Sequence, residues 1–76
     1  MDKEKVVLIT GASGGIGSTT VAKFSQCGWK VIGVDRRNFE GKFPTDGLFI
    51  LADISKPEDI SSIYEKANSF SPFLNA

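Results

Sequence analysis

Four glycines gathered in seven residues are the feature of this sequence best suited to chemistry. They lie in Gly11–Gly17, after the apolar run Val6–Ile9 and before a segment with helical patterning. Glycine lets a backbone turn tightly and approach another molecule closely. A helix that begins directly after such a turn offers unpaired N–H groups and the positive end of its dipole, which suit a phosphate. The stretch therefore predicts a phosphate-binding turn between a strand and a helix.

The elements expected around this turn alternate between strand and helix. Apolar runs predict strands at Val6–Thr10, Trp29–Asp35 and Leu48–Ala52. Each run is apolar along its whole length, which is typical of strands in a parallel sheet covered on both faces. The segment 36–47 is expected to be a loop, with one helical turn at most, anchored by two phenylalanines. This order predicts an α/β fold with right-handed crossovers.

Two helices are expected, one directly after the glycine turn and one after the third strand. The first should run over about 18–27 and stop at Gly28. The second should run over about 56–68, because apolar residues recur there at positions i, i+3, i+4 and i+7. Ser55 and Glu58 have the spacing of a capping box, with Ser55 as the N-cap and Glu58 reaching back.

Two aspartates stand at strand ends. Asp35 ends the second strand, 24 positions after Gly11 (35 − 11), close to the ~20 positions at which a carboxylate takes a ribose hydroxyl in dinucleotide sites. Asp53 follows the third strand and precedes Ile54. Aspartate is also common where a strand enters a turn. We favour a ribose contact for Asp35. Asp53 either contacts a ligand or only helps to start the next helix.

The pattern Thr-Gly-x-x-x-Gly-Ile-Gly over Thr10–Gly17, with these two aspartates in their places, resembles the short-chain dehydrogenase/reductase family. The resemblance implies the N-terminal part of a Rossmann-type parallel sheet, with three strands, two helices and a truncated fourth strand. Residues 1–76 would form a partial NAD(P)-binding domain with the strand order 3-2-1-4. It also implies an oxidoreductase that transfers hydride between a nicotinamide cofactor and a carbonyl or alcohol.

The resemblance gives each residue of the glycine turn a role. Gly11 would permit the turn, and backbone N–H groups near Ser13 and Ile16 would face the cofactor pyrophosphate. Gly15 would allow close approach of the cofactor. Gly17 would let the helix pack against the strand.

The two strand ends would hold the adenosine half of the cofactor. Asp35 would bind the ribose hydroxyls and repel a 2′-phosphate, which favours NAD. Arg36 and Arg37 leave NADP as an alternative, since a guanidinium there accepts a phosphate if it is not simply a solvated loop charge. Asp53 and Ile54 would lie beside the adenine ring.

The sequence lacks the residues that would make it catalytic. The resembled family uses a tyrosine with a lysine four positions later, but position 68 after Tyr64 is an asparagine. Tyr64 is therefore expected to be a residue of the hydrophobic core, on the second helix. No serine of this sequence corresponds to the one that accompanies the tyrosine–lysine pair in the family. Phe73–Ala76 is expected to begin a fourth strand. Without that strand, the edge formed by Val6–Ile9 would be exposed, which suggests self-association.

Two other functions stay open at this stage. A non-catalytic nucleotide-binding module would complete its sheet by dimerising or by accepting a partner's strand. A degenerate P-loop ATPase of the ParA/MinD type is also similar around the glycines. However, both lysine positions of that pattern hold serine, Ser13 and Ser18. The 11 positions from Gly17 to Gly28 also make a shorter first helix than those ATPases normally have.

The composition of the sequence limits the partners, metal sites and cellular compartment to be expected. Nine basic and nine acidic residues cancel, so the sequence predicts neither a nucleic-acid nor a membrane partner. With one cysteine and no histidine, neither a disulfide framework nor a metal site is expected. Cys27 is expected to be a small buried residue. Together these features favour a cytoplasmic protein.

Overall fold

The structure is a computed structural model that describes residues 5–71. It contains three strands and two helices: β1 (Val6–Thr10), α1 (Gly15–Gln26), β2 (Lys30–Asp35), β3 (Leu48–Leu51) and α2 (Pro57–Phe70). The predicted α/β class and the order of the elements are confirmed. The element ends differ from the predicted ones by up to three residues, and most clearly at the start of α1.

The three strands form one parallel sheet in the order β1-β2-β3. In this register Thr10 of β1 pairs with Val34 of β2, and Val34 pairs in turn with Ile50 of β3. Because all three strands run the same way, their carboxyl ends gather at one edge of the sheet. The expected fourth strand at Phe73–Ala76 lies outside the described residues.

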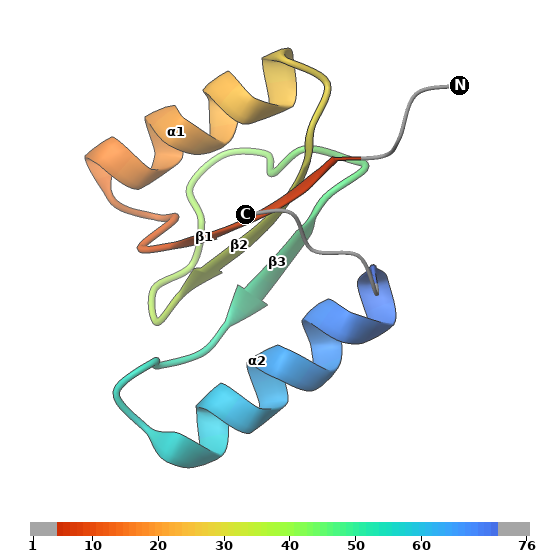
Figure 1. The fold of residues 1–76 in the computed structure, drawn as a ribbon. Coiled ribbons are helices and arrows are strands. Elements are labelled where there is room, and N and C mark those ends of the chain that lie inside the picture. Colours follow the sequence, from red (N-terminus) through yellow and green to blue (C-terminus); the bar gives the residue numbers. More distant parts are fainter. Residues whose placement is uncertain (1–4, 72–76) are drawn as a thin grey trace.

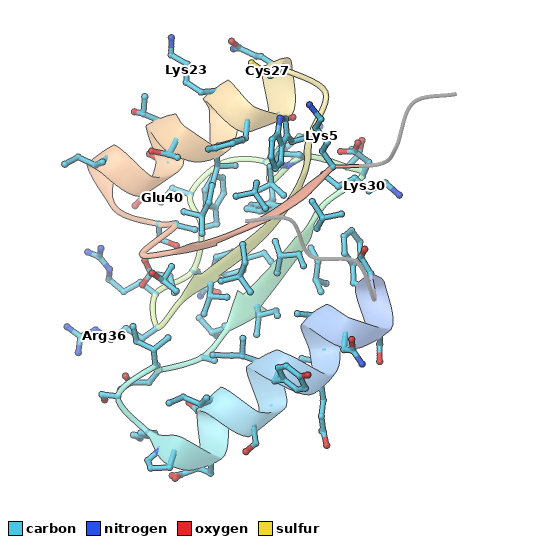
Figure 2. All side chains as sticks on the ribbon, in the orientation of Figure 1. Lys5, Lys23, Cys27, Lys30, Arg36 and Glu40 are labelled. Atoms are coloured by element: carbon cyan, nitrogen blue, oxygen red, sulfur yellow. The ribbon has the colours of Figure 1, made fainter. Side chains whose placement is uncertain are left out.

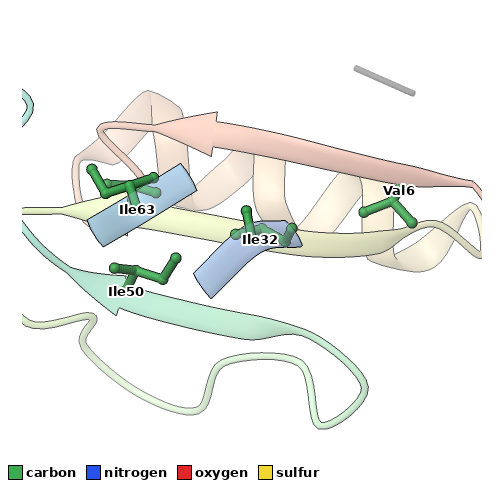
Figure 3. Packing of buried hydrophobic residues seen from close by; sticks show 6 residues of the cluster. Val6, Ile32, Ile50 and Ile63 are labelled. Atoms are coloured by element: carbon green, nitrogen blue, oxygen red, sulfur yellow. The ribbon is translucent and has the colours of Figure 1, made fainter. Parts of the chain in front are cut away.

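One helix covers each face of the sheet, α1 on one side and α2 on the other (Figure 1). Neighbouring residues of β2 show why its sequence does not alternate: Val31 packs toward α1 and Ile32 toward α2, and both are fully buried. On the α2 side, Val6, Ile32 and Ile50 belong to one buried cluster with Ile63 of the helix (Figure 3). Within residues 5–71, neither helix has the length and apolar character that crossing a membrane requires.

The loop between β2 and β3 folds back over the α1 face through its aromatic rings. The ring centroids of Phe39 and Phe43 lie 5.0 Å apart, and that of Phe43 lies 5.6 Å from that of Phe49 on β3. Gly33 leaves room for them, since a Cβ there would lie 2.7 Å from Phe43 Cε1. The predicted aromatic anchor is confirmed, whereas no helical turn forms in this loop.

The predicted capping box at the start of α2 is wrong. Lys56 is the N-cap and makes no side-chain capping bond, and Pro57 occupies the first turn. The Ser55 hydroxyl instead donates to Asp53 Oδ1 at 2.7 Å. The carboxylate that reaches back belongs to Asp59, whose Oδ2 accepts the Asp53 N–H at 2.8 Å. Proline explains the shift, because it fixes the start of the helix at the residue that follows Lys56.

Two residues expected in the core are at the surface. Tyr64 is 72 % exposed, because α2 meets the sheet through Ile63 and Ala67 and the next residue along a helix points about 100° away. Cys27 is exposed, because it is the C-cap of α1, where the chain leaves the helix toward Gly28. Both predictions of burial are therefore wrong.

Candidate functional site

The glycine turn is a compact hydrogen-bonded bend at the carboxyl end of β1. Gly11 has φ +68°, a left-handed conformation that glycine adopts without strain. The Gly14 N–H donates to the Gly11 carbonyl at 3.1 Å, and the Ala12 N–H donates to the Val34 carbonyl of β2 at 3.1 Å. These bonds finish the turn by Gly14, so α1 begins at Gly15 instead of near Ser18.

The start of α1 presents backbone donors at this edge of the sheet. Within α1, Ser18 is the first residue whose N–H bonds back to a carbonyl of the turn, that of Gly14 at 2.8 Å. The N–H groups of Gly15, Ile16 and Gly17 precede it, and a helix offers no carbonyl to such groups. Gly14, the N-cap, has no side chain to accept them, and the first turn contains no acidic residue. This end of α1 is therefore positive and open.

Two glycines of the turn differ in what surrounds them. A Cβ on Gly17 would overlap the Gly11 carbonyl oxygen, so the helix approaches the turn closely only because that side chain is missing. A Cβ on Gly15 would meet nothing within 4 Å. Gly17 is thus needed by the fold itself, whereas the space at Gly15 is left open by the chain.

Asp35, the last residue of β2, faces the glycine turn from the neighbouring strand. Asp35 is buried, with 8 % of its surface exposed. Oδ1 accepts the Arg37 N–H at 3.0 Å, and Oδ2 accepts the Ser13 N–H at 2.9 Å. The bond from the Arg37 N–H, followed by that from Ser13 and the Arg37 charge, lowers the pKa of Asp35 below its usual 3.8 despite partial desolvation. The carboxylate is ionised at neutral pH, and in this structure it takes the Ser13 N–H expected to face a pyrophosphate.

The two arginines after Asp35 occupy different places. Arg37 Nε lies 3.7 Å from Asp35 Oδ1, and its Nη2 would lie 3.7 Å from a Cβ on Gly14. The Arg37 carbonyl accepts the Ser13 hydroxyl at 2.8 Å. The Arg36 side chain extends outward from the carboxyl edge of the sheet (Figure 2). Of the two arginines named as candidates for a phosphate contact, Arg37 is therefore the one beside the glycine turn.

A small hollow lies between the ends of β2 and β3. Its volume is about 250 Å³, and it is lined by Asp35, Arg36, Ala52, Asp53, Ile54 and Ser55. This is just below the roughly 300–1,000 Å³ of whole ligand sites, so the hollow suits one part of a ligand. The Ser55 hydroxyl, followed by the Ser55 N–H, lowers the pKa of Asp53. Asp53 thus shapes the entry into α2 and also borders the hollow.

Acid is expected to weaken the link between Asp35 and the glycine turn. The folded pKa of Asp35 is lowered from 3.8, so its contribution to stability is present above pH 3.8 and is lost as the pH falls through the folded value. The free energy of unfolding of the wild type should therefore approach that of Asp35→Asn as the pH drops below 3.8. Urea unfolding of both chains between pH 7 and pH 2.5 would check this. A constant difference across that range would contradict it.

Residues 5–72 match the family described as short chain dehydrogenase. The chain belongs to that family. The match spans both strand-end aspartates and the whole glycine turn, so the resemblance drawn from those residues is confirmed. The P-loop ATPase alternative is accordingly wrong.

Two curated relatives are similar to this chain over most of its length. An uncharacterized oxidoreductase, YxnA, from Bacillus subtilis is 37 % identical over 75 residues, covering 88 % of this chain and 21 % of that protein. An uncharacterized oxidoreductase from Schizosaccharomyces pombe is 40 % identical over 62 residues, covering 82 % of this chain and 24 % of that protein. This chain therefore spans about a quarter or less of the length of these relatives.

Solved structures agree in fold. A 3-ketoacyl-(acyl-carrier-protein) reductase from Brucella melitensis, complexed with NADH, superposes with a TM-score of 0.83 at 36 % identity, over 92 % of this chain and 31 % of that one. A short chain dehydrogenase from Leptospira borgpetersenii with bound NAD⁺ gives 0.83 at 29 % identity, over 95 % of this chain and 29 % of that one. The Rossmann-type arrangement predicted for the sheet is thereby confirmed.

The structure brings the predicted site residues to one edge of the sheet. Gly11–Gly17 follows β1, Asp35 and Arg36 end β2, and Asp53 and Ile54 follow β3. The contact between Ser13 and Arg37 had no signal in the sequence, because it depends on the strand register. Thr10 pairs with Val34, and Ser13 and Arg37 each stand three positions beyond one of these paired residues.

Proposed function

We propose that this chain is the dinucleotide-binding segment of a short-chain dehydrogenase/reductase-like oxidoreductase and that its cofactor is NAD. The observation that carries the proposal is the placement of the open start of α1, with the free space at Gly15, directly beside the ionised Asp35 carboxylate. Donors for phosphate oxygens and an acceptor for ribose hydroxyls then stand side by side. That pairing suits the two ends of an adenosine diphosphate group.

The remaining residues fit the other parts of the ligand. The N–H groups of Ile16 and its neighbours would hold the pyrophosphate, and Gly11 and Gly17 would keep the turn in place for it. A carboxylate has about four lone-pair positions. Asp35 accepts the Ser13 and Arg37 N–H groups, and positions that these do not use would accept ribose hydroxyls. Asp53 and Ile54 would border the adenine in the small hollow.

The preference for NAD over NADP rests on charge. Asp35 is nearly buried and ionised, so a 2′-phosphate beside it would be repelled. Arg36 and Arg37 reduce this repulsion, so NADP is expected to bind more weakly without being excluded. Two of the superposed enzymes carry NADH or NAD⁺, which supports the same preference.

The reaction of the whole protein would be hydride transfer between the nicotinamide and a carbonyl or alcohol carbon. The 76 residues contain neither the tyrosine–lysine pair nor the serine expected for it. We therefore propose that residues 1–76, as a partial cofactor-binding domain, hold the cofactor without turning over substrate. The balanced charge and single cysteine favour a cytoplasmic location.

A second candidate is a non-catalytic module that associates with itself through β1. It is favoured by an apolar hollow of about 380 Å³ between Leu8 of β1 and Ile60, Ile63, Tyr64 and Ala67 of α2. Ile60 and Tyr64 are 52 % and 72 % exposed. A strand and helix added there by another chain would cover this apolar surface.

Calorimetry of the chain with NAD, NADP and Mg-ATP at one ionic strength tests the first proposal, and light scattering on the same sample tests the second. We expect NAD to bind more tightly than NADP and more tightly than Mg-ATP. A folded chain that binds none of the dinucleotides would overturn the cofactor proposal. A concentration-independent dimer with appreciable NAD affinity would favour the self-associating module.

A further inference from the structure

We propose that Ser13 is a positioning residue whose hydroxyl holds the segment after β2 in place, so that Asp35 and Arg37 face the glycine turn. The inference deepens the proposed function, because it assigns to Ser13 the arrangement of groups that would receive the adenosine ribose. It starts from the two bonds that Ser13 makes across the strand ends.

Ser13 reaches the neighbouring segment with both its backbone and its side chain. Its N–H donates to Asp35 Oδ2 at 2.9 Å, and its hydroxyl donates to the Arg37 carbonyl at 2.8 Å. The partners lie 22 and 24 positions away in the sequence. Ser13 therefore connects the turn after β1 to the turn after β2 beyond the last paired residues of the two strands.

The side-chain bond acts on Asp35 through Arg37. The carbonyl of Arg37 accepts from Ser13, and its N–H donates to Asp35 Oδ1 at 3.0 Å. Both ends of one residue are thus fixed, one to the glycine turn and one to the carboxylate. When the hydroxyl is absent, the Arg37 carbonyl loses its restraint, and the bond from the Arg37 N–H to Asp35 is then held less firmly in place.

The backbone bond of Ser13 does not depend on its side chain, whereas the bond to Arg37 does. Serine and threonine both place a hydroxyl donor at this position, and alanine places none. Loss of the restraint should leave Asp35 less well oriented for a ribose diol. One hydrogen bond to a neutral carbonyl corresponds to an affinity change of about fivefold, which is the expected weakening for NAD.

The test compares Ser13→Ala with Ser13→Thr and with Ser18→Ala as a matched control. Ser18 also donates its hydroxyl to a carbonyl, that of Gly15 at 3.2 Å, but within α1. The first readout is an NMR pH titration of the Asp35 carboxyl in the ligand-free chain. The bond from Arg37 is the largest cause of the lowered pKa of Asp35, so Ser13→Ala should raise that pKa toward 3.8. Ser13→Thr should restore it, and Ser18→Ala should leave it unchanged.

The second readout is NAD affinity by calorimetry, which should fall about fivefold in Ser13→Ala and recover in Ser13→Thr. An unchanged Asp35 titration in a folded Ser13→Ala chain would overturn the inference even if NAD binds. A shifted titration in a chain that binds no NAD would uphold the positioning role and reject the cofactor proposal. If Ser13→Ala does not fold, Ser13→Cys, of similar size but with a weak donor, takes its place in both measurements.

Discussion

Replacing Gly17 with alanine is expected to lower the free energy of unfolding by about 3 kcal/mol or more. The added Cβ would overlap the Gly11 carbonyl oxygen and come within 3.0 Å of Ala12 Cα. Both are backbone atoms of a turn fixed by its own hydrogen bonds, so no side chain can rotate away to relieve the overlap. A chain of this size is expected to have only roughly 4–11 kcal/mol of stability, which makes the loss severe. Urea unfolding followed by circular dichroism would measure it.

Gly15→Ala is the matched control because it makes the same chemical change two positions earlier. A Cβ there meets nothing within 4 Å, and alanine is at least as good a helix former as glycine. Stability should therefore stay within about 0.5 kcal/mol of the wild type. Dinucleotide affinity should nevertheless fall about tenfold or more, because the methyl group enters the space left open at the start of α1. Equal stability of the two variants would contradict the packing role of Gly17.

Asp35→Ala is expected to change both stability and cofactor preference. The Ser13 and Arg37 N–H groups would lose their acceptor, which costs about 2 kcal/mol for bonds to a charged group. The ribose hydroxyls would also lose their acceptor, while Arg36 and Arg37 would still attract a 2′-phosphate. The ratio of NAD to NADP affinity should therefore drop by about tenfold or more. Calorimetry with both dinucleotides at one ionic strength would measure this ratio.

Asp46→Ala serves as the control for that experiment. It removes the same charge from an exposed position in the loop between β2 and β3. Neither stability nor the ratio of affinities should change by more than the experimental error. If Asp46→Ala shifts the ratio as far as Asp35→Ala does, the preference arises from net charge alone, and the specific role of Asp35 is wrong.

The strands were predictable because their signals are local and strong. Unbroken apolar runs such as that of β2 reflect a sheet covered on both faces, and the structure places Val31 and Ile32 on opposite faces as this requires. The start of α1 was not predictable from helical periodicity, because glycines carry no side chains and so show no period. Its position depends on the hydrogen bonds that complete the turn at Gly14.

Surface exposure was harder to predict from periodicity. Tyr64 and Ile63 are adjacent and both fit an apolar stripe, but α2 contacts a sheet of three strands along a narrow face. The capping box failed for a related reason. Several polar residues stand within a few positions of one another around the start of α2. Only the three-dimensional path of the chain replaces the predicted pair of Ser55 and Glu58 with a bond from the Asp53 N–H to Asp59.

The candidate site was predictable in its composition but not in its internal contacts. The glycines and the two aspartates lie at one edge of the sheet, as their positions at the ends of the predicted strands required. The bonds from Ser13 to Asp35 and to the Arg37 carbonyl depend on the strand register and on the conformation of the turn after β2. Neither can be derived from residue types alone, which is why the sequence did not distinguish the place of Arg37 from that of Arg36.

The exposed thiol at the far end of α1 gives this chain a convenient reporter position. Cys27 is the one cysteine of the sequence and follows the last turn of a 12-residue helix whose first turn adjoins the glycines (Figure 2). At 1.5 Å per residue, about 18 Å of helix separates the two ends. A maleimide fluorophore can therefore be attached at a single known atom without touching the proposed ligand-binding edge. Fluorescence from such a label would follow unfolding in every variant described above except Ser13→Cys, which adds a second thiol.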